Sequence, residues 1–216
     1  MELLIATYNN GKIRELVQAL RGLPITPRYL CDFPDTSPVE ETGKTYEENA
    51  VLKSADYCER TGLYSLADDS GLEVDALEGR PGVKSARFGG ENASDADRTA
   101  KLLQELLAYK GSQRTARFVC YMSLAGPSIA SGIETPAARI LNISQGFCEG
   151  MIALEPRGTG GFGYDPVFIP TGHDETFGEL LSEVKAKLSH RAKAISAMRL
   201  FLTQFLSELD PPPTAP

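Results

Sequence analysis

Apolar and polar residues alternate along the chain in a way that separates strand-like from helix-like segments. Residues 2–7, ELLIAT, form a short apolar run with β-branched members and predict a strand, which the turn residues of YNNGK follow. After this turn, apolar residues recur at helical spacing, at Ile13, Leu16, Val17 and Leu20. A strand, a loop and a helix are therefore expected at the start of the chain.

Three further helices are indicated. The clearest lies between Thr45 and Gly62, because Thr45 and Glu48 fit a capping box and glycine commonly ends helices. A second, over residues 94–109, has Ser94 as its expected N-cap, and its core-facing residues are expected to be Ala100, Leu103 and Leu107 or their neighbours. The last helix is expected over about residues 189–209.

Four more segments are strand-like. Residues 63–69, LYSLADD, end at a Ser-Gly turn, and residues 71–77, GLEVDAL, alternate apolar and acidic side chains. The long stretches 114–126 and 138–153 are expected to form a hairpin, with an irregular tip at residues 128–137. This order of elements predicts an α/β or α+β fold with a mixed sheet flanked by helices.

Neither a repeat nor a change in composition marks a boundary inside the chain. We therefore expect a single domain over residues 1–209 and a flexible C-terminal tail over residues 210–216, DPPPTAP.

Composition and charge narrow the classes of function. The 216 residues are 42% hydrophobic, and the formal net charge is −7. Such an acidic chain is not expected to bind nucleic acid or an anionic membrane, since both need basic patches. The chain contains no apolar stretch of membrane-spanning length, and MELLIATYNN is not a signal peptide, so a cytoplasmic location is expected.

The cysteines and histidines argue against two kinds of site. The four cysteines are widely separated and form no C-x-x-C pair, so we expect buried thiols rather than disulfides or a zinc site. Only two histidines are present, and no H-E-x-x-H motif occurs, which argues against a histidine-rich zinc site.

The acidic residues offer a candidate metal site. Asp68 and Asp69 follow an apolar strand, and Glu40 and Glu41 lie in an earlier loop. Magnesium prefers carboxylate oxygens together with water and substrate phosphates. The alternative, that these are solvated surface charges, suits Asp68 and Asp69 less well because they follow buried-type residues.

Three other segments carry candidate binding groups. The loop TYNNGK, residues 7–12, precedes a helix and could receive phosphate, although it could equally be an ordinary polar turn. The segment GTGGFGYDPVF, residues 158–168, joins glycines to aromatic rings that could stack on a base, or it is a glycine-rich hairpin loop. The basic segment KAKLSHRAKA, residues 185–194, could face a phosphate or a base carbonyl, or be a solvated helix face.

Taken together and in this order, TYNNGK, EETGKTYEENAVLKS, LADDSGLEVDAL, GRPGVKSAR, PRGTGGFGYDPVF and LSHRAKA resemble the inosine triphosphate pyrophosphatase family. The resemblance runs from residue 4 to about residue 199. It implies an elongated α/β fold with two lobes around a central substrate groove, and a homodimer. One departure is Tyr8, which stands where the family loop usually has a small residue.

The resemblance also implies roles for individual residues. Asp69 would be the proton acceptor, supported by Asp68, and Mg²⁺ would be bound by Glu40 and Asp69. The residues implied to bind substrate are Thr7, Asn9, Asn10, Gly11, Lys12, Lys53, Ser70, Phe162, Gly163, Tyr164, Asp165, Lys185, His190 and Arg191.

The implied activity is hydrolysis of the non-standard purine nucleoside triphosphates ITP, dITP and XTP to the nucleoside monophosphate and pyrophosphate, which removes damaged nucleotides from the precursor pool. Two alternatives stay open: a nucleotide pyrophosphatase with another base preference, and a nucleotide-binding regulator without turnover.

Overall fold

The computed structural model describes residues 1–90, 92–128 and 137–209. Its six strands form one sheet in the order β2-β1-β3-β4-β5-β6. The sheet is mixed, because β1 pairs in parallel with β2 and β3 whereas β5 and β6 are antiparallel. The strands are β1 (Glu2–Ile5), β2 (Thr26–Tyr29), β3 (Tyr64–Val74), β4 (Thr115–Ser128), β5 (Ala137–Ile152) and β6 (Phe168–Pro170). The expected α/β class and mixed sheet are confirmed.

The helices are α1 (Asn10–Ala19), α2 (Tyr46–Thr61), α3 (Asp95–Glu105), α4 (Ser182–Leu188) and α5 (His190–Leu209). Local signals fix both ends of α2. The Thr45 side chain accepts from the backbone N–H of Glu48, whose own carboxylate accepts from the backbone N–H of Thr45. Gly62 then ends α2 in the left-handed conformation, with φ of 69°.

The strand β3 corrects one prediction. Two strands separated by a Ser-Gly turn were expected, but one strand of 11 residues runs through both segments. Asp68 and Asp69 therefore lie inside a strand rather than at its end. The local turn signal is overridden because β3 is a central strand of the sheet, with β1 and β4 as neighbours.

The residues of α3 that face the core are neighbours of the three positions named from the sequence, Ala100, Leu103 and Leu107. Thr99, Leu102 and Leu106 are buried, whereas Leu107 is 76% exposed. Apolar residues occur in adjacent pairs at 102–103 and 106–107, so helical spacing alone cannot decide which member of each pair faces the core.

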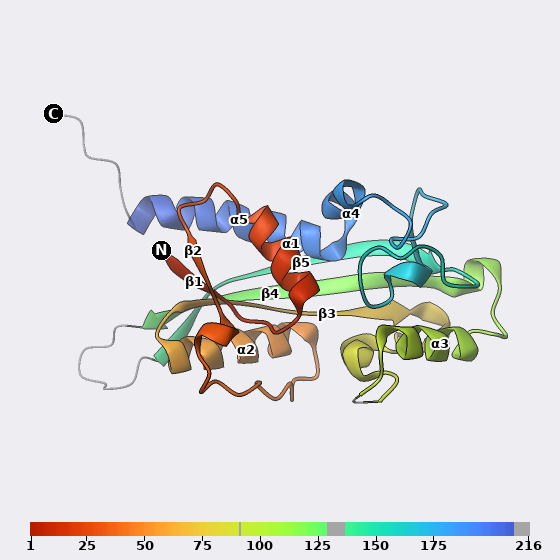
Figure 1. Ribbon diagram of the computed structural model, residues 1–216, viewed down its shortest axis with the longest axis horizontal. Helices are drawn as coiled ribbons and strands as arrows, with labels where there is room; N and C mark the ends of the chain where they lie inside the picture. Colours follow the sequence, from red (N-terminus) through yellow and green to blue (C-terminus); the bar gives the residue numbers. More distant parts are fainter. Residues whose placement is uncertain (91, 129–136, 210–216) are drawn as a thin grey trace. The chain divides into compact units, whose positions relative to one another are not determined.

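The described chain divides into two compact units. The first unit comprises Met1–Asp69, Tyr121–Ser144 and the chain from Ala194 onward, and Leu4, Ala6, Leu30, Tyr57 and Ala67 form a hydrophobic cluster in it. In this unit, α2 and α5 lie on opposite sides of the strands (Figure 1). The expectation of a single domain over residues 1–209 stays a prediction.

The second unit comprises Ser70–Cys120 and Gln145–Lys193. Its core gathers residues from β3, α3, β4, β5 and β6, among them Leu72, Leu102, Phe118, Ile152 and Phe168. Three phenylalanine rings from three segments meet there: Phe118 and Phe168 have ring centroids 4.5 Å apart, and Phe168 and Phe177 5.3 Å.

All four cysteines are free thiols. Cys58, Cys120 and Cys148 are buried as expected, but Cys31 is exposed, which corrects the expectation for that residue. Within the described ranges, no helix has the length and apolar character needed to cross a membrane. The predicted tail, residues 210–216, and residues 129–136 of the predicted hairpin tip lie outside the described residues.

Candidate active site

The loop between β1 and α1 has the geometry of a helix N-terminus that can receive an anion. Asn9 is the N-cap of α1, and its side-chain oxygen accepts from the backbone N–H of Lys12 at 3.0 Å. The Thr7 hydroxyl in turn accepts from the backbone N–H of Asn9 at 3.2 Å. Asn10 begins the helix, and Gly11 is buried in its first turn. Tyr8, the departure from the family loop, donates its hydroxyl to the Thr36 carbonyl at 2.9 Å.

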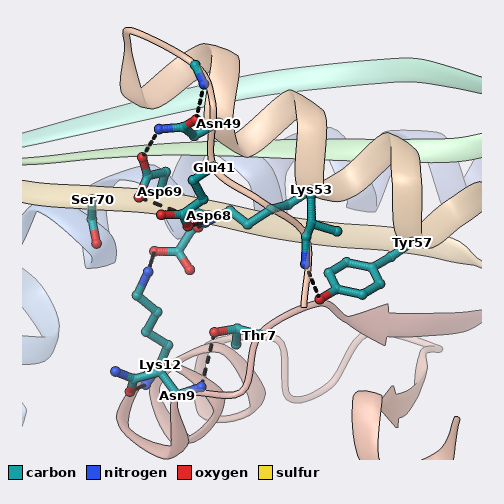
Figure 2. A network of polar contacts seen from close by, with 12 residues as sticks. Thr7, Asn9, Lys12, Glu41, Asn49, Lys53, Tyr57, Asp68, Asp69 and Ser70 are labelled. Carbon is teal, nitrogen blue, oxygen red and sulfur yellow. Dashed lines mark hydrogen bonds and ion pairs between the residues drawn. The ribbon is translucent and has the colours of Figure 1, made fainter. Parts of the chain in front are cut away.

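The two adjacent carboxylates of β3 have different partners (Figure 2). Asp68 and Asp69 are 2% and 5% exposed. The ammonium of Lys12 lies 3.0 Å from Asp68 Oδ2, and the amide of Asn49 donates to Asp69 Oδ2 at 3.0 Å. Consecutive strand residues point to opposite faces, so each carboxylate has its own partner from a helix, α1 for Asp68 and α2 for Asp69.

Lys53 of α2 joins this pair to the loop that follows β2. Its ammonium lies 2.6 Å from Glu41 Oε1 and 3.8 Å from Asp69 Oδ1, and it donates to the Asp68 carbonyl oxygen at 2.7 Å. Glu41 is thus the loop carboxylate that this network contains, whereas the neighbouring Glu40 is exposed. We call Lys12, Glu41, Asn49, Lys53, Asp68 and Asp69 the carboxylate cluster.

Burial and neighbouring charges in the carboxylate cluster shift the pKa values of two groups, Asp69 and Lys53. Burial is the main cause that raises the pKa of Asp69, and the Glu41 carboxylate raises it further, against the lowering effect of Lys53. Burial alone would lower the pKa of Lys53. The surrounding carboxylates, Asp69 first and then Glu41 and Asp68, outweigh burial and raise it. Lys53 therefore stays charged and holds the carboxylates together.

The donor set of the cluster fits a hard divalent cation. Its oxygens come from carboxylates and an amide, which are the ligands such cations prefer. Among the described residues, no three or more His, Cys, Asp or Glu side chains converge as a ready-made cage. A small number of protein ligands is typical of magnesium sites, because the ion usually keeps waters and substrate phosphates as its remaining ligands.

The second unit brings together the other predicted residues around the loop of residues 158–165, which we call the base loop. Asp165 Oδ2 accepts from the backbone N–H of Phe162 and from the ammonium of Lys185, both at 2.7 Å. The positively charged Lys185 Nζ lies 4.8 Å from the centroid of the Phe162 ring, and the Arg191 guanidinium carbon lies 5.4 Å from it.

The aromatic and basic residues of this set differ in accessibility. Phe162 is partly exposed, whereas Tyr164 is 4% exposed and donates its hydroxyl to the Ser85 carbonyl at 2.9 Å. Of the two rings, Phe162 is therefore the more accessible to a ligand. His190 is buried and stacks on Phe118, with centroids 4.6 Å apart.

Arg191 contacts Ser70, the residue at which the second unit begins in the sequence. Its guanidinium donates to the Ser70 hydroxyl at 2.8 Å. Ser70 directly follows Asp69. The carboxylate cluster and the residues that contact the base loop are therefore neighbours in the sequence at this point.

Three residues of these networks are not among those to which the family resemblance assigns a role, although Glu41 is one of the acidic candidates for a metal site. Asn49 is 1% exposed, and a polar residue among the buried positions of α2 was a usable signal for it. Glu41 could not be separated from Glu40 without the position of Lys53. Asp95 accepts from the backbone N–H of Gly163 at 2.6 Å, and nothing in the sequence links residues so far apart.

The comparison with family models decides the family. The model of the Ham1 family matches residues 3–201, which is most of the chain. The chain belongs to the Ham1 family. The resemblance to nucleotide pyrophosphatases that the motifs indicated is thereby confirmed.

Known Ham1 relatives and structures agree with this assignment. A dITP/XTP pyrophosphatase of Geobacter sulfurreducens is 48% identical over 197 residues, 91% of this chain and 94% of that protein. One of Exiguobacterium sibiricum is 46% identical over 208 residues, 96% of this chain and 100% of that protein. The structure of a HAM1 protein from Coxiella burnetii superposes with a TM-score of 0.81 at 40% identity, covering 94% of this chain and 99% of that one.

Proposed function

We propose that the chain hydrolyses the non-standard purine nucleoside triphosphates dITP, ITP and XTP to the nucleoside monophosphate and pyrophosphate. The observation that carries the proposal is the pair of buried carboxylates Asp68 and Asp69, held among the ammonium groups of Lys12 and Lys53. Relatives nearly as long as this chain that are named dITP/XTP pyrophosphatases support the choice of substrate.

Asp69 is the proposed general base. A water molecule gives its proton to an Asp69 oxygen and attacks the α-phosphorus, and the bond from this phosphorus to the bridging oxygen of the leaving pyrophosphate breaks. Asn49 holds the carboxylate in place through its 3.0 Å hydrogen bond.

The phosphates are assigned to the loop of residues 7–12 and to the two lysines. Backbone N–H groups at the start of α1 point toward an anion, and the helix dipole favours negative charge there. The Lys12 ammonium lies 3.0 Å from Asp68, and the triphosphate would offer it a second anionic partner. Lys53 contributes positive charge beside Asp69.

Mg²⁺ is the proposed cofactor, with Asp69 and a loop glutamate, Glu40 or Glu41, as its proposed ligands. Glu40 is the residue that the family resemblance implies, and Glu41 is the one whose carboxylate lies 2.6 Å from Lys53 in the carboxylate cluster. When bound, the cation would neutralise phosphate charge and lower the pKa of the attacking water. Asp68 is left to hold Lys12.

The base is assigned to the residues of the second unit. Phe162 offers a partly exposed ring for stacking, and Gly163 and Asp165 shape the loop around it. Lys185 and Arg191 are donors only, so a 6-keto oxygen matches them and the 6-amino group of adenine does not. A buried mismatch of this kind penalises the wrong base strongly. Ser70 supports Arg191 by accepting a hydrogen bond from its guanidinium, while His190 stacks on Phe118 and Tyr164 donates to the Ser85 carbonyl.

The experiment that tests the proposal is steady-state hydrolysis of ITP, dITP, XTP, GTP, ATP and dUTP, with excess Mg²⁺ and with excess EDTA. We expect rapid release of pyrophosphate from the first three nucleotides, little hydrolysis of ATP and dUTP, and no turnover in EDTA. Equal rates on ATP and ITP would contradict the base preference. Release of orthophosphate would contradict the site of cleavage.

Two further assignments belong to the proposal. A cytoplasmic location fits a substrate drawn from the nucleotide pool, and a homodimer follows from the family resemblance. Fractionation of cells and measurement of the molar mass in solution test them separately from the activity.

A further inference from the structure

We infer that Asp95, the first residue of α3, is a positioning residue that holds the base loop in its binding conformation and thereby contributes to recognition of the nucleobase. The inference rests on the proposed function, since it takes Phe162 and its neighbours as the base-contacting residues. It concerns a residue 68 positions away from Gly163 in the sequence.

The base loop is held by two carboxylates that bind consecutive backbone N–H groups. Asp165 accepts from the N–H of Phe162 at 2.7 Å, and Asp95 accepts from the N–H of Gly163 at 2.6 Å. Gly163 has φ of 63°, a conformation that glycine adopts without strain. Because both N–H groups flank the Cα atom of Phe162, the two carboxylates together fix the backbone from which its ring extends.

Close packing of side chains between α3 and the base loop does not take over the role of the hydrogen bond from the Gly163 N–H to Asp95. A cavity of about 590 Å³ is lined by Asp95 and Gly163 themselves, together with Leu103 of α3 and Pro156 and Pro166 of the chain near the loop. Side chains of α3 and of the loop segment are thus not closely packed along this cavity. The hydrogen bond between Asp95 and Gly163 joins two of the residues that line this cavity.

The Asp95 carboxylate is itself fixed. Its second oxygen forms an ion pair with Arg98, one helical turn away. Arg98 also donates to the carbonyl oxygens of Ala86 and Ala93, at 2.9 and 2.7 Å. Burial alone would raise the pKa of Asp95, but the Gly163 hydrogen bond and Arg98 together lower it, which agrees with a charged acceptor.

The test compares Asp95→Ala with a matched control, Asp97→Ala. Asp97 lies in the same turn of α3, where its carboxylate caps the helix through Ser94. Both variants remove a carboxylate at the start of α3, but in the described contacts only Asp95 reaches the base loop. Three quantities are measured for each: KM and kcat for dITP with Mg²⁺, the inhibition constant of inorganic tripolyphosphate, and hydrogen exchange of the amides of residues 158–165.

For Asp95→Ala we expect KM for dITP to rise about tenfold, the size of effect expected for losing one partly exposed hydrogen bond to a charged group. Tripolyphosphate has no base, so its inhibition constant is expected to stay unchanged. The loop amides are expected to exchange faster. Asp97→Ala is expected to leave all three quantities unchanged, and Asp95→Asn, which keeps an acceptor oxygen, is expected to recover part of the KM effect.

Two outcomes would overturn the inference. One is an Asp95→Ala variant with the same KM and the same loop exchange as Asp97→Ala. The other is an inhibition constant for tripolyphosphate that rises as much as KM, which would indicate general damage to the site. A wild-type protein inactive on dITP, ITP and XTP would refute the proposed function, and the exchange comparison would still decide whether Asp95 holds the loop.

Discussion

Two neighbouring carboxylates can both stay ionised inside a protein when each has its own cation or hydrogen-bond donor. Asp68 has Lys12, and Asp69 has Asn49 together with the more distant charge of Lys53. The strand makes this possible because successive side chains leave it in opposite directions. In the proposed function, Asp69, the more exposed of the pair, is the carboxylate assigned to the chemistry.

The first prediction concerns Asp69. Replacement by Asn keeps the volume of the side chain but removes the proton acceptor, so we expect kcat for dITP to fall by a factor of about 100 or more. The melting temperature and the far-ultraviolet circular dichroism are expected to stay close to those of the wild type.

Asp56→Asn is the matched control for this prediction. Asp56 also forms an ion pair, 2.8 Å from Arg60, but on α2 away from the carboxylate cluster. Its kcat is expected to equal that of the wild type. Activity of Asp69→Asn at the level of Asp56→Asn would refute the assigned role.

The second prediction concerns the ion pair of Asp165 and Lys185, whose side chains are 4% and 10% exposed. Lys185→Met leaves the carboxylate buried without its cation, and breaking one side of such a pair costs about 3 kcal/mol of unfolding free energy. Denaturant unfolding measures this loss.

Lys187→Met supplies the control, since Lys187 lies on the same helix but is exposed. It is expected to change the unfolding free energy by less than about 0.5 kcal/mol. If both variants lose the same stability, the pair does not contribute as described.

At the scale of secondary-structure elements, Asp95 at the start of α3 makes the folding stability depend on pH. The pKa of Asp95 is lower in the folded protein than its ordinary value of about 3.9. A carboxyl group with a depressed folded pKa stabilises the protein above its unfolded pKa, and this contribution is lost as the pH falls through the folded pKa.

The third prediction follows from this sign. Asp95→Asn should melt at a lower temperature than the wild type at pH 7, and the difference should shrink as the pH falls below about 4. Melting temperatures of both proteins across this range check it. A difference that stays constant down to the lowest pH at which both proteins fold would show that the charge of Asp95 does not stabilise the fold.

The elements differ in how far the sequence determines them. The helix α2 is predictable because its ends depend on Thr45, Glu48 and Gly62, which act within a few residues. The short strands β2 and β6, each a few residues long, depend on pairing with distant segments and give no local pattern. The continuity of β3 through Ser70 has the same cause.

The candidate site shows the same division. The residues of the loop 7–12 and the acidic pair Asp68 and Asp69 are visible as motifs, because each lies in one short segment. Asn49, Glu41 and Asp95 act through contacts with residues 12 or more positions away, at Asp69, Lys53 and Gly163. Such contacts are set by the fold, so the sequence alone does not show which residues they join.

At the scale of the whole molecule, three strands belong to both compact units. The strands β3, β4 and β5 each begin in one unit and end in the other. A domain joined to its neighbour by one linker can unfold alone, but here the covalent chain passes between the units inside hydrogen-bonded strands. Unfolding of either unit would therefore disrupt strands of the other, and we expect the units to unfold together.

The cysteines allow this fourth prediction to be measured in each unit separately. Cys58 lies in the first unit and Cys148 in the second, and burial is the main cause that raises the pKa of each thiol to about 11. Both thiols should therefore resist a thiol reagent in the folded protein, whereas the exposed Cys31 should react at once.

The experiment uses two variants that each retain one of these buried cysteines, with the others replaced by serine or alanine. Thiol labelling is followed against denaturant concentration, and both variants must first show the same midpoint by circular dichroism. If the units unfold together, Cys58 and Cys148 become reactive at the same concentration, as the prediction of one domain over residues 1–209 requires. Labelling midpoints that differ between the two thiols would show that one unit opens while the other stays folded, and the chain would then behave as two domains.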